Sequence, residues 1–149
     1  MIEARYVFGN EAMQLSGGIR YEVFTEEQGV DIQYERDFYD YFAHHVVVMK
    51  DDLPLATGRL IFTNEVFLIG RVAVLKDHRG NNYGDLVVRM LIDRAFSIGA
   101  DEVEVHAQLS VQGFYEGIGF IPIGEAFYEE GIEHIKMVVD QKSLQKSCQ

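Results

Sequence analysis

The residues best suited to chemistry lie in one segment, Arg71–Asp85. An apolar stretch, Val72–Val74, leads toward a loop that contains two glycines and two asparagines. Glycine and asparagine adopt a positive φ more readily than other residues, so successive backbone N–H groups can turn toward one centre. The helix expected after this loop adds unpaired N–H donors and the positive end of its dipole. The segment therefore predicts a cradle for a pyrophosphate group, to which the Arg79 guanidinium could add a charge-assisted contact.

The same segment also fits a tight strand-to-helix turn that binds nothing, and the pattern leaves both interpretations open. It is not a P-loop, because Gly-Lys-Ser/Thr is missing, and the dinucleotide pattern Gly-x-Gly-x-x-Gly is also absent. A chain of net charge −11 could still hold an anion here. Salt screens distant charges beyond about 8–10 Å, so the local backbone field decides.

Hydrophobic periodicity predicts the elements that position this loop. Three strands joined by short turns indicate an antiparallel meander, and the later elements alternate helix and strand. A mixed α/β sheet with helices on both faces follows from this order. The acidic, aromatic segment 31–42 is expected to be a loop or short helix over a cleft. The expected helices are 10–28, 83–98 and 111–116, and the expected strands are 45–49, 55–62, 66–74, 103–107, 120–123 and 132–139.

Length and composition set the remaining expectations. The 149 residues predict one domain, 1–149, with a frayed tail over 140–149. The excess of 24 acidic over 13 basic side chains disfavours binding to nucleic acid or to an anionic membrane. No apolar run approaches the roughly 18–20 residues that span a bilayer, and the start does not resemble a secretory signal. We therefore expect a cytoplasmic protein without a metal, in which the lone Cys148 is an inert thiol.

On these residues the sequence resembles the GCN5-related N-acetyltransferases. The phosphate-binding motif of that family, Arg/Gln-x-x-Gly-x-Gly/Ala, matches Arg79–Gly84, with Asn82 in place of the middle glycine. A second motif matches at Gln108, where asparagine is usual, at Tyr115 and at Gly119-Phe120. The resemblance covers nearly the whole chain and is closer to the small bacterial ElaA-like and YjcF-like branch. The residues that suggest this branch include Arg20, Glu27–Val30, Thr57–Leu60, Gly70–Val74, Phe127 and His134.

The resemblance implies a mostly antiparallel sheet of six to seven strands, with a splay between the strands around 66–74 and 102–107. It implies direct acetyl transfer from acetyl-CoA to a primary amine of a small molecule or peptide. Backbone groups of Val72 and Val74 would pair with the pantetheine arm, and the N–H of Val72 or Ala73 would stabilise the oxyanion. The other cofactor-binding residues would be Arg79, Gly80, Asn81, Asn82, Tyr83, Gly84 and Gln108.

Two proton transfers need residues. Tyr115 would protonate the departing thiolate, although it also fits a helix residue packed beside Phe114. An amine with a pKa near ~10 must lose a proton before it attacks. The glutamate that some family members carry on the strand before Val72 is missing from residues 66–71. The candidate bases that remain are His106, His134, His45, Glu27, Glu35 and Asp37.

Arg59 and Arg71 are expected on adjacent strands, where two arginines need carboxylate partners. They could pair structurally with Glu27, Asp37 or Asp40, or shape an acceptor pocket with Gln28 and Tyr34. The absent glutamate and Asn82 also leave a second function open, a non-catalytic acyl-CoA-binding or sensing module. The last strands could pair between two chains, which allows a homodimer.

Overall fold

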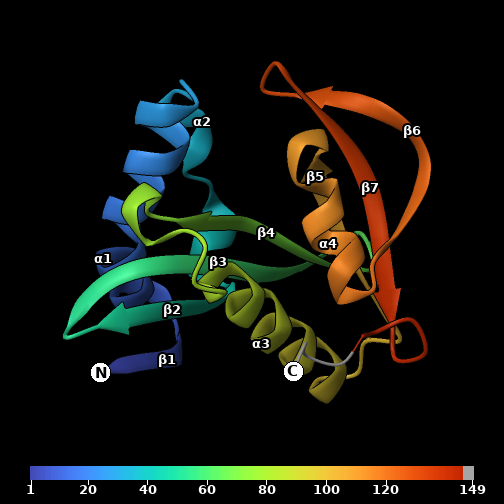
Figure 1. The fold of residues 1–149 in the computed structure, drawn as a ribbon, viewed down its shortest axis with the longest axis horizontal. Coiled ribbons are helices and arrows are strands. Elements are labelled where there is room, and N and C mark those ends of the chain that lie inside the picture. Colours follow the sequence, from blue (N-terminus) through green and yellow to red (C-terminus); the bar gives the residue numbers. More distant parts are fainter. Residues whose placement is uncertain (146–149) are drawn as a thin grey trace.

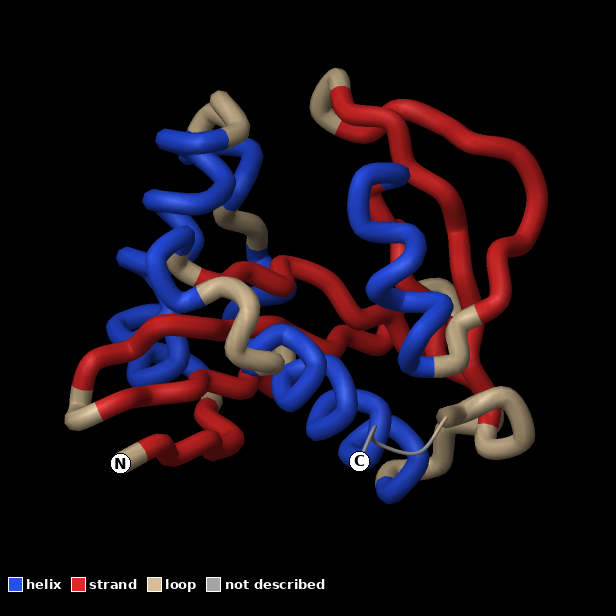
Figure 2. Tube along the Cα trace, viewed as in Figure 1, coloured by secondary structure: helices blue, strands red, loops and turns tan. Residues whose placement is uncertain are grey.

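The computed structural model describes residues 1–145, which form one seven-stranded sheet flanked by helices (Figures 1 and 2). The strand order is β1-β2-β3-β4-β5-β7-β6. The strands are β1 (Ile2–Val7), β2 (His44–Lys50), β3 (Leu53–Thr63), β4 (Val66–Val74), β5 (Glu102–Gln108), β6 (Ile121–Glu129) and β7 (Ile132–Asp140). The helices are α1 (Gly9–Arg20), α2 (Ile32–Glu35), α3 (Tyr83–Ser97) and α4 (Gln112–Ile118). The wide helical turn η1 (Tyr21–Glu27) continues α1, and the 3₁₀ turns are η2 (Phe38–Tyr41), η3 (Lys76–His78) and η4 (Leu109–Val111).

The sheet divides where β4 meets β5. Every other pair of neighbouring strands is antiparallel, but β4 and β5 are parallel. They pair only from Phe67–Ile69 to Val103–Val105. Beyond Ile69 the strands diverge, with β1–β4 on one side and β5–β7 on the other (Figure 1). The predicted mixed α/β fold and its splay are confirmed.

Successive side chains of β2 pack into different clusters, which shows that helices cover both faces of the sheet. Val46 and Val48 belong to the main core, together with buried residues of α3 and α4. Val47 and Met49 pack instead against Ala12 of α1. Because successive side chains of a strand point to opposite faces, α1 lies on one face and α3 with α4 on the other.

A bulge interrupts β4 at the point where the strands part. Gly70 pairs with Arg59 and Ala73 with Thr57, so Arg71 and Val72 together oppose Gly58. Arg71 has a φ of 49°, which is costly for a residue with a side chain. A Cβ on Gly58 would lie 2.6 Å from Val87 of α3, so glycine lets that helix pack closely here.

Some elements differ from the sequence-based expectation. The edge strand β1 was not predicted, because six residues of weak alternation give little signal without the partner strand β2. Strand β6 extends to Glu129, well beyond the expected 120–123, because it follows β7 across a register shift. Segment 31–42 forms the short helical turns α2 and η2.

Residues 141–145, which follow β7, lie against the body of the protein. The Gln145 backbone N–H donates to the Ile118 carbonyl at 2.7 Å, and Leu144 packs against the main core. Cys148 lies outside the described residues. In residues 1–145, no helix is long and apolar enough to span a membrane.

Candidate functional site

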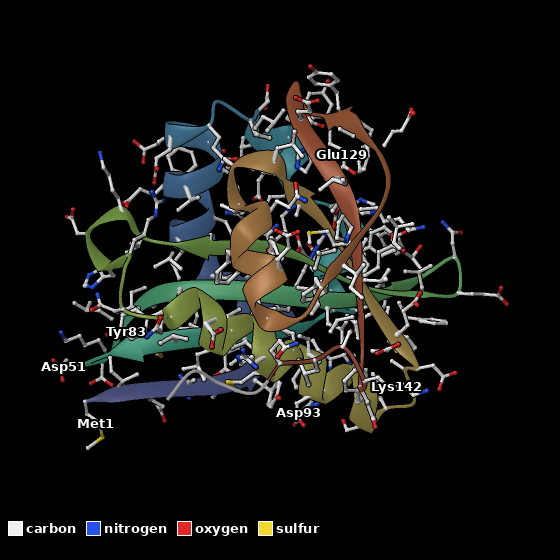
Figure 3. The ribbon with its side chains drawn as sticks, turned by 45° about the vertical axis from the view of Figure 1, so that its right-hand side comes forward. Met1, Asp51, Tyr83, Asp93, Glu129 and Lys142 are labelled. Carbon is white, nitrogen blue, oxygen red and sulfur yellow. The ribbon has the colours of Figure 1, made fainter. Side chains whose placement is uncertain are left out.

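A cavity of about 870 Å³ opens where β4 and β5 diverge. It is lined by residues of η1, α2, β4, the loop before α3, β5, α4 and the turn between β6 and β7. Tyr83 and Glu129, which both line it, lie far apart in Figure 3, so the cavity is elongated. It gathers most site residues expected from the sequence, but not Asn81 or the candidate bases His45 and Asp37. Those that line it are Gln28, Tyr34, Arg59, Arg71, Val72, Ala73, Val74, Arg79, Gly80, Asn82, Tyr83, Gly84, His106, Gln108, Tyr115 and His134.

At one end of the cavity, the loop before α3 presents unsatisfied backbone donors. Within the described residues, the N–H groups of residues 80–85 have no hydrogen-bond acceptor. Asn82 has φ 65° and ψ 18°, the left-handed conformation that asparagine tolerates, and α3 begins at the next residue. A row of free N–H groups at the start of a long helix is suited to a phosphate or pyrophosphate group.

Two polar side chains of this loop, those of Arg79 and Asn81, stabilise it rather than remain free. The Arg79 Nε donates to the Val74 carbonyl at 2.9 Å, and its Nη2 pairs with Glu27 at 2.8 Å. Asn81 does not line the cavity, and its Nδ2 donates to the His78 carbonyl at 3.1 Å. In this structure the loop therefore presents its backbone N–H groups to a ligand, while the Arg79 charge is already paired with Glu27.

The middle of the cavity runs along the open edge of β4. Pairing with β5 ends at Ile69, so residues 70–74 have no strand neighbour on that side. An exposed edge can pair with an extended ligand as another strand would. The Gln108 Nε2 donates to the Gln28 Oε1 at 3.0 Å, a contact that joins β5 to the end of η1.

Tyr115 of α4 lies among aromatic rings and is 7% exposed. Its ring meets those of Phe114 and Phe120 edge-on, at centroid distances of 5.0 and 5.4 Å. Burial raises the pKa of the Tyr115 phenol well above its usual value. The hydroxyl therefore holds its proton at neutral pH, as a general acid requires.

His134 of β7 has one ring nitrogen available. Its Nδ1 lies 2.7 Å from the Ile132 carbonyl oxygen, which can only accept, so Nδ1 carries a proton. In the neutral ring Nε2 then bears the lone pair, and no other described residue contacts it through a hydrogen bond. The ring stacks on Phe127 at a centroid distance of 6.1 Å and lines the cavity. This geometry suits a proton acceptor.

His106 of β5 has both ring nitrogens occupied. Nδ1 lies 2.7 Å from Glu129 Oε1, and Nε2 lies 2.8 Å from Glu104 Oε2. The hydrogen bond to Glu129, opposed by burial and supported by Glu104, raises the pKa of His106. The ring therefore favours the imidazolium form, which clamps β5 to β6 and is poorly placed to accept another proton.

The other candidate bases are engaged elsewhere. His45 is buried outside the cavity, and its Nε2 donates to the Asp40 carbonyl at 2.9 Å. Burial lowers the pKa of the His45 imidazole. Glu27 pairs with Arg79, while Glu35 and Asp37 belong to a group of arginine–carboxylate pairs. Among the candidate histidines, His134 alone combines a place in the cavity with an unoccupied acceptor atom in the described structure.

That group, called the arginine cluster below, contributes Glu35, Arg59 and Arg71 to the lining of the cavity. Arg20 pairs with Glu35 at 2.8 Å and with Asp40 at 2.7 Å. Arg59 bonds Asp37 at 2.6 Å and Asp40 at 2.8 Å, so its structural pairing is shown. The full cluster consists of Arg20, Arg36, Arg59, Arg71, Glu35, Asp37 and Asp40.

Sequence reasoning missed several contributors to this site. Glu104 could have been found, because it lies two residues before His106 and therefore on the same face of the strand. Glu129 could not, because its position depends on the length and register of β6. The apolar lining was also missed, since its residues read as ordinary core positions: Val23, Phe24, Ile61, Leu68, Ile69 and Ile132.

Comparisons with known proteins agree with this geometry. The family model described as an acetyltransferase (GNAT) domain matches residues 9–141. The chain is 31% identical over 123 residues to YjcF of Bacillus subtilis (strain 168), an uncharacterized N-acetyltransferase, across 82% of this chain and 88% of that protein. It is 32% identical over 124 residues to protein ElaA of Escherichia coli (strain K12), across 80% and 81%.

Solved structures show the same relationship. The crystal structure of Escherichia coli ElaA has a TM-score of 0.81 at 29% identity, covering 91% of this chain and 98% of that one. An acyl-CoA N-acyltransferase from Pseudomonas aeruginosa also has a TM-score of 0.81, at 25% identity, covering 93% and 99%. The family resemblance seen in the sequence is confirmed, and this chain belongs to the GNAT acetyltransferase family.

Proposed function

We propose that this protein transfers an acetyl group from acetyl-CoA directly to a primary amine of a small molecule or peptide. Family membership supports acyl transfer in general. The observation that carries the finer proposal is the single elongated cavity, which joins the N–H row at residues 80–85 to Tyr115 and His134. A phosphate-bearing cosubstrate, a protonated acid and an available base thus share one space.

In this proposal the loop N–H groups bind the CoA pyrophosphate, and Arg79 keeps the loop in shape. The open edge of β4 pairs with the pantetheine arm, as a further strand would. The Val72 or Ala73 backbone N–H lies beside the thioester carbonyl and stabilises the oxyanion of the tetrahedral intermediate. Val74 and Gln108 complete this wall of the cavity.

The remaining chemistry is two proton transfers. His134 Nε2 accepts a proton from the attacking amine, directly or through a water molecule. The amine nitrogen bonds to the carbonyl carbon, and the intermediate then releases the CoA thiolate. Tyr115 donates its proton to that sulfur. Gln28, Tyr34 and Arg71 line the space left for the acceptor.

Calorimetry with acetyl-CoA, CoA and ATP tests the cosubstrate. We expect saturable binding of acetyl-CoA and CoA at micromolar levels. ATP should bind more weakly, because it shares the phosphates but has no pantetheine arm to pair with β4. Absence of CoA binding would overturn the proposal together with its non-catalytic alternative.

Tyr115→Phe separates an enzyme from an acyl-CoA sensor. Release of CoA thiol is measured with a panel of primary amines. We expect turnover to fall by about 100-fold, since positioned acid–base groups typically contribute 10²–10⁴-fold, while CoA affinity stays within about twofold. Tyr128→Phe is the matched control, because Tyr128 is 72% exposed on β6 and outside the cavity. CoA binding without acetylation of any amine would favour the sensing module instead.

A further inference from the structure

We infer that the amine acceptor carries a carboxylate group, and that the Arg71 side chain binds it. This inference rests on the proposed function and names the substrate class of the same cavity. It begins with the balance of charge in the arginine cluster. Four guanidinium groups face three carboxylates, those of Glu35, Asp37 and Asp40. The cluster therefore retains one positive charge.

The charged groups around the cluster pair mainly with one another, although the Arg71 charge also contributes to the lowered pKa of the Glu129 carboxyl. His106 and Lys136 pair with Glu104 and Glu129, two cations with two carboxylates. At the other end of the cavity Arg79 pairs with Glu27. Each of these sets is balanced within itself, so the excess charge stays with the arginine cluster.

Arg71 is the member that can offer this charge to a ligand. Arg20 and Arg59 are buried, and their side chains are 1% and 6% exposed. Arg36 does not line the cavity. The Arg71 side chain is 30% exposed and lines the cavity at the point where β4 leaves β5.

The hydrogen bonds of Arg71 leave part of its guanidinium free. Its Nε donates to the Glu35 carbonyl oxygen at 3.0 Å, and its Nη2 donates to Asp37 Oδ2 at 3.3 Å. Within residues 1–145, Nη1 has no acceptor. These contacts orient the guanidinium but leave donors for a further anion. Arg71 also has a positive φ, so the backbone is strained at the residue that carries this guanidinium. Backbone strain of this kind occurs at ligand-binding positions.

One excess charge matches a singly charged anion. A carboxylate carries one negative charge and two oxygens that suit the planar guanidinium, whereas a phosphate monoester brings about 1.5–2 negative charges at neutral pH. Glu130, in the turn between β6 and β7, also lines the cavity. Its carboxylate forms no ion pair among the described residues. The cavity therefore presents one uncompensated cation and one uncompensated carboxylate, which fits an amino acid better than a plain amine.

Matched acceptors test this inference without any mutation. Acetyl transfer is measured with α- and ω-amino acids and with the carboxamide of each. The amine of an α-amino acid amide is less basic and more deprotonated at neutral pH, so basicity alone favours the amide. We expect kcat/KM to be higher for the acids by about tenfold or more, because a charge-assisted contact is lost in the amide.

Two variants that each remove one positive charge show which residue causes the preference for acids over amides. Arg71→Gln should reduce the acid-to-amide ratio of kcat/KM to about one, mainly through a higher KM for the acid. Arg36→Gln removes the same charge from the same cluster outside the cavity and should keep the preference. Thermal unfolding and CoA calorimetry of both variants show whether fold and cosubstrate site are intact, and Arg71→Lys provides a second substitution that retains the charge.

The outcomes separate this inference from the proposed function. Equal rates for acids and amides in the unmodified protein overturn the inference and leave the acetyltransferase proposal standing. A preference for acids that survives Arg71→Gln, or disappears in Arg36→Gln, overturns the assignment to Arg71. CoA binding with no transfer to any acceptor overturns the proposed function itself.

Discussion

His106 and His134 are similar in the sequence but differ in what their nitrogens contact. Both lie on strands that line one cavity, and the strands carrying them are paired neighbours. Two carboxylates hold His106 as a cation, whereas a single carbonyl oxygen fixes the His134 tautomer and leaves Nε2 available. A histidine's chemical role follows from these partners, because they decide which ring nitrogen bears a lone pair.

His134→Gln tests the proposed base. Glutamine can still donate to the Ile132 carbonyl but cannot accept a proton at this pH. We expect kcat to fall by about 100-fold near neutral pH. The deficit should shrink as the pH approaches the pKa of the amine, because the acceptor then arrives deprotonated. The measurement is a pH–rate profile, with CoA affinity unchanged.

His106→Gln is the comparison variant. Its effect should fall mainly on stability, because the raised pKa of His106 means that folding favours the protonated ring. That contribution is present below the ordinary pKa of histidine and is lost as the pH rises through the raised value. Unfolding at pH 6 and pH 9 should therefore show the larger deficit at pH 6. A larger loss of kcat for His106→Gln than for His134→Gln would exchange the two roles.

At the scale of elements, the loop between β4 and α3 has the property that an anion site needs. Residues 80–85 leave their N–H groups free because α3 begins at Tyr83 and Asn82 adopts a left-handed conformation. Asparagine thus preserves the loop where the family motif has glycine, which removes one reason for favouring a non-catalytic module. The interpretation as an empty turn does not require this row of donors.

A pair of substitutions at Asn82 tests this conclusion. Asn82→Gly and Asn82→Ala both remove the side-chain amide, but alanine is strained at a positive φ. We expect Asn82→Ala to be less stable than Asn82→Gly by about 1 kcal/mol and to bind CoA more weakly. Asn82→Gly should bind CoA like the unmodified protein. Equal weakening in both variants, measured by calorimetry, would mean that the asparagine amide itself contributes to binding.

At the scale of the molecule, the arginine cluster joins segments that are distant in the chain. Arg20 from α1 and Arg59 from β3 both bond Asp40 of η2, so three parts of the fold meet in this cluster. A chain with a net charge of −11 therefore carries a cluster with one excess positive charge, part of which lines the cavity. Burial opposes ionisation of Asp40, but Arg20 and Arg59 outweigh it and lower its pKa to about 2.

Acid unfolding measures what this cluster contributes. A depressed carboxyl pKa gives stability that is present above the unfolded pKa near 3.8 and is lost as the pH falls through the folded value of about 2. We expect Asp40 to account for about 2 kcal/mol of this loss. Asp40→Asn should remove that part of the pH dependence and, at pH 7, cost about 3–5 kcal/mol, because two buried arginines, Arg20 and Arg59, each lose one charged partner.

Denaturant unfolding between pH 7 and pH 2 is the measurement. Asp51→Asn is the control, since the Asp51 carboxylate pairs with the chain terminus at an exposed position. The pKa of Asp51 is also lowered, by its hydrogen bond to the chain terminus, but solvent screens this exposed pair. The control should therefore depart from the unmodified protein much less than Asp40→Asn does. An unchanged slope for Asp40→Asn below pH 4 would contradict a dominant role for this carboxylate.

The sequence by itself determined the family, the mixed sheet and many of the polar residues that line the cavity, and the family resemblance added the splay. These follow from local signals: hydrophobic periodicity, the glycine and asparagine spacing of residues 79–84, and the motif around Tyr115. Such signals are readable because neighbours in the chain remain neighbours in the fold.

Only the tertiary structure decided which side chains are free. In the folded protein, Arg79 is paired with Glu27, and His106 with Glu104 and Glu129. Arg59 is paired with Asp37 and Asp40. It left His134 Nε2 and part of the Arg71 guanidinium without protein partners among the described residues. The physical reason is that hydrogen bonds and ion pairs act over a few ångströms between segments far apart in the chain. Strand register and helix packing set those distances.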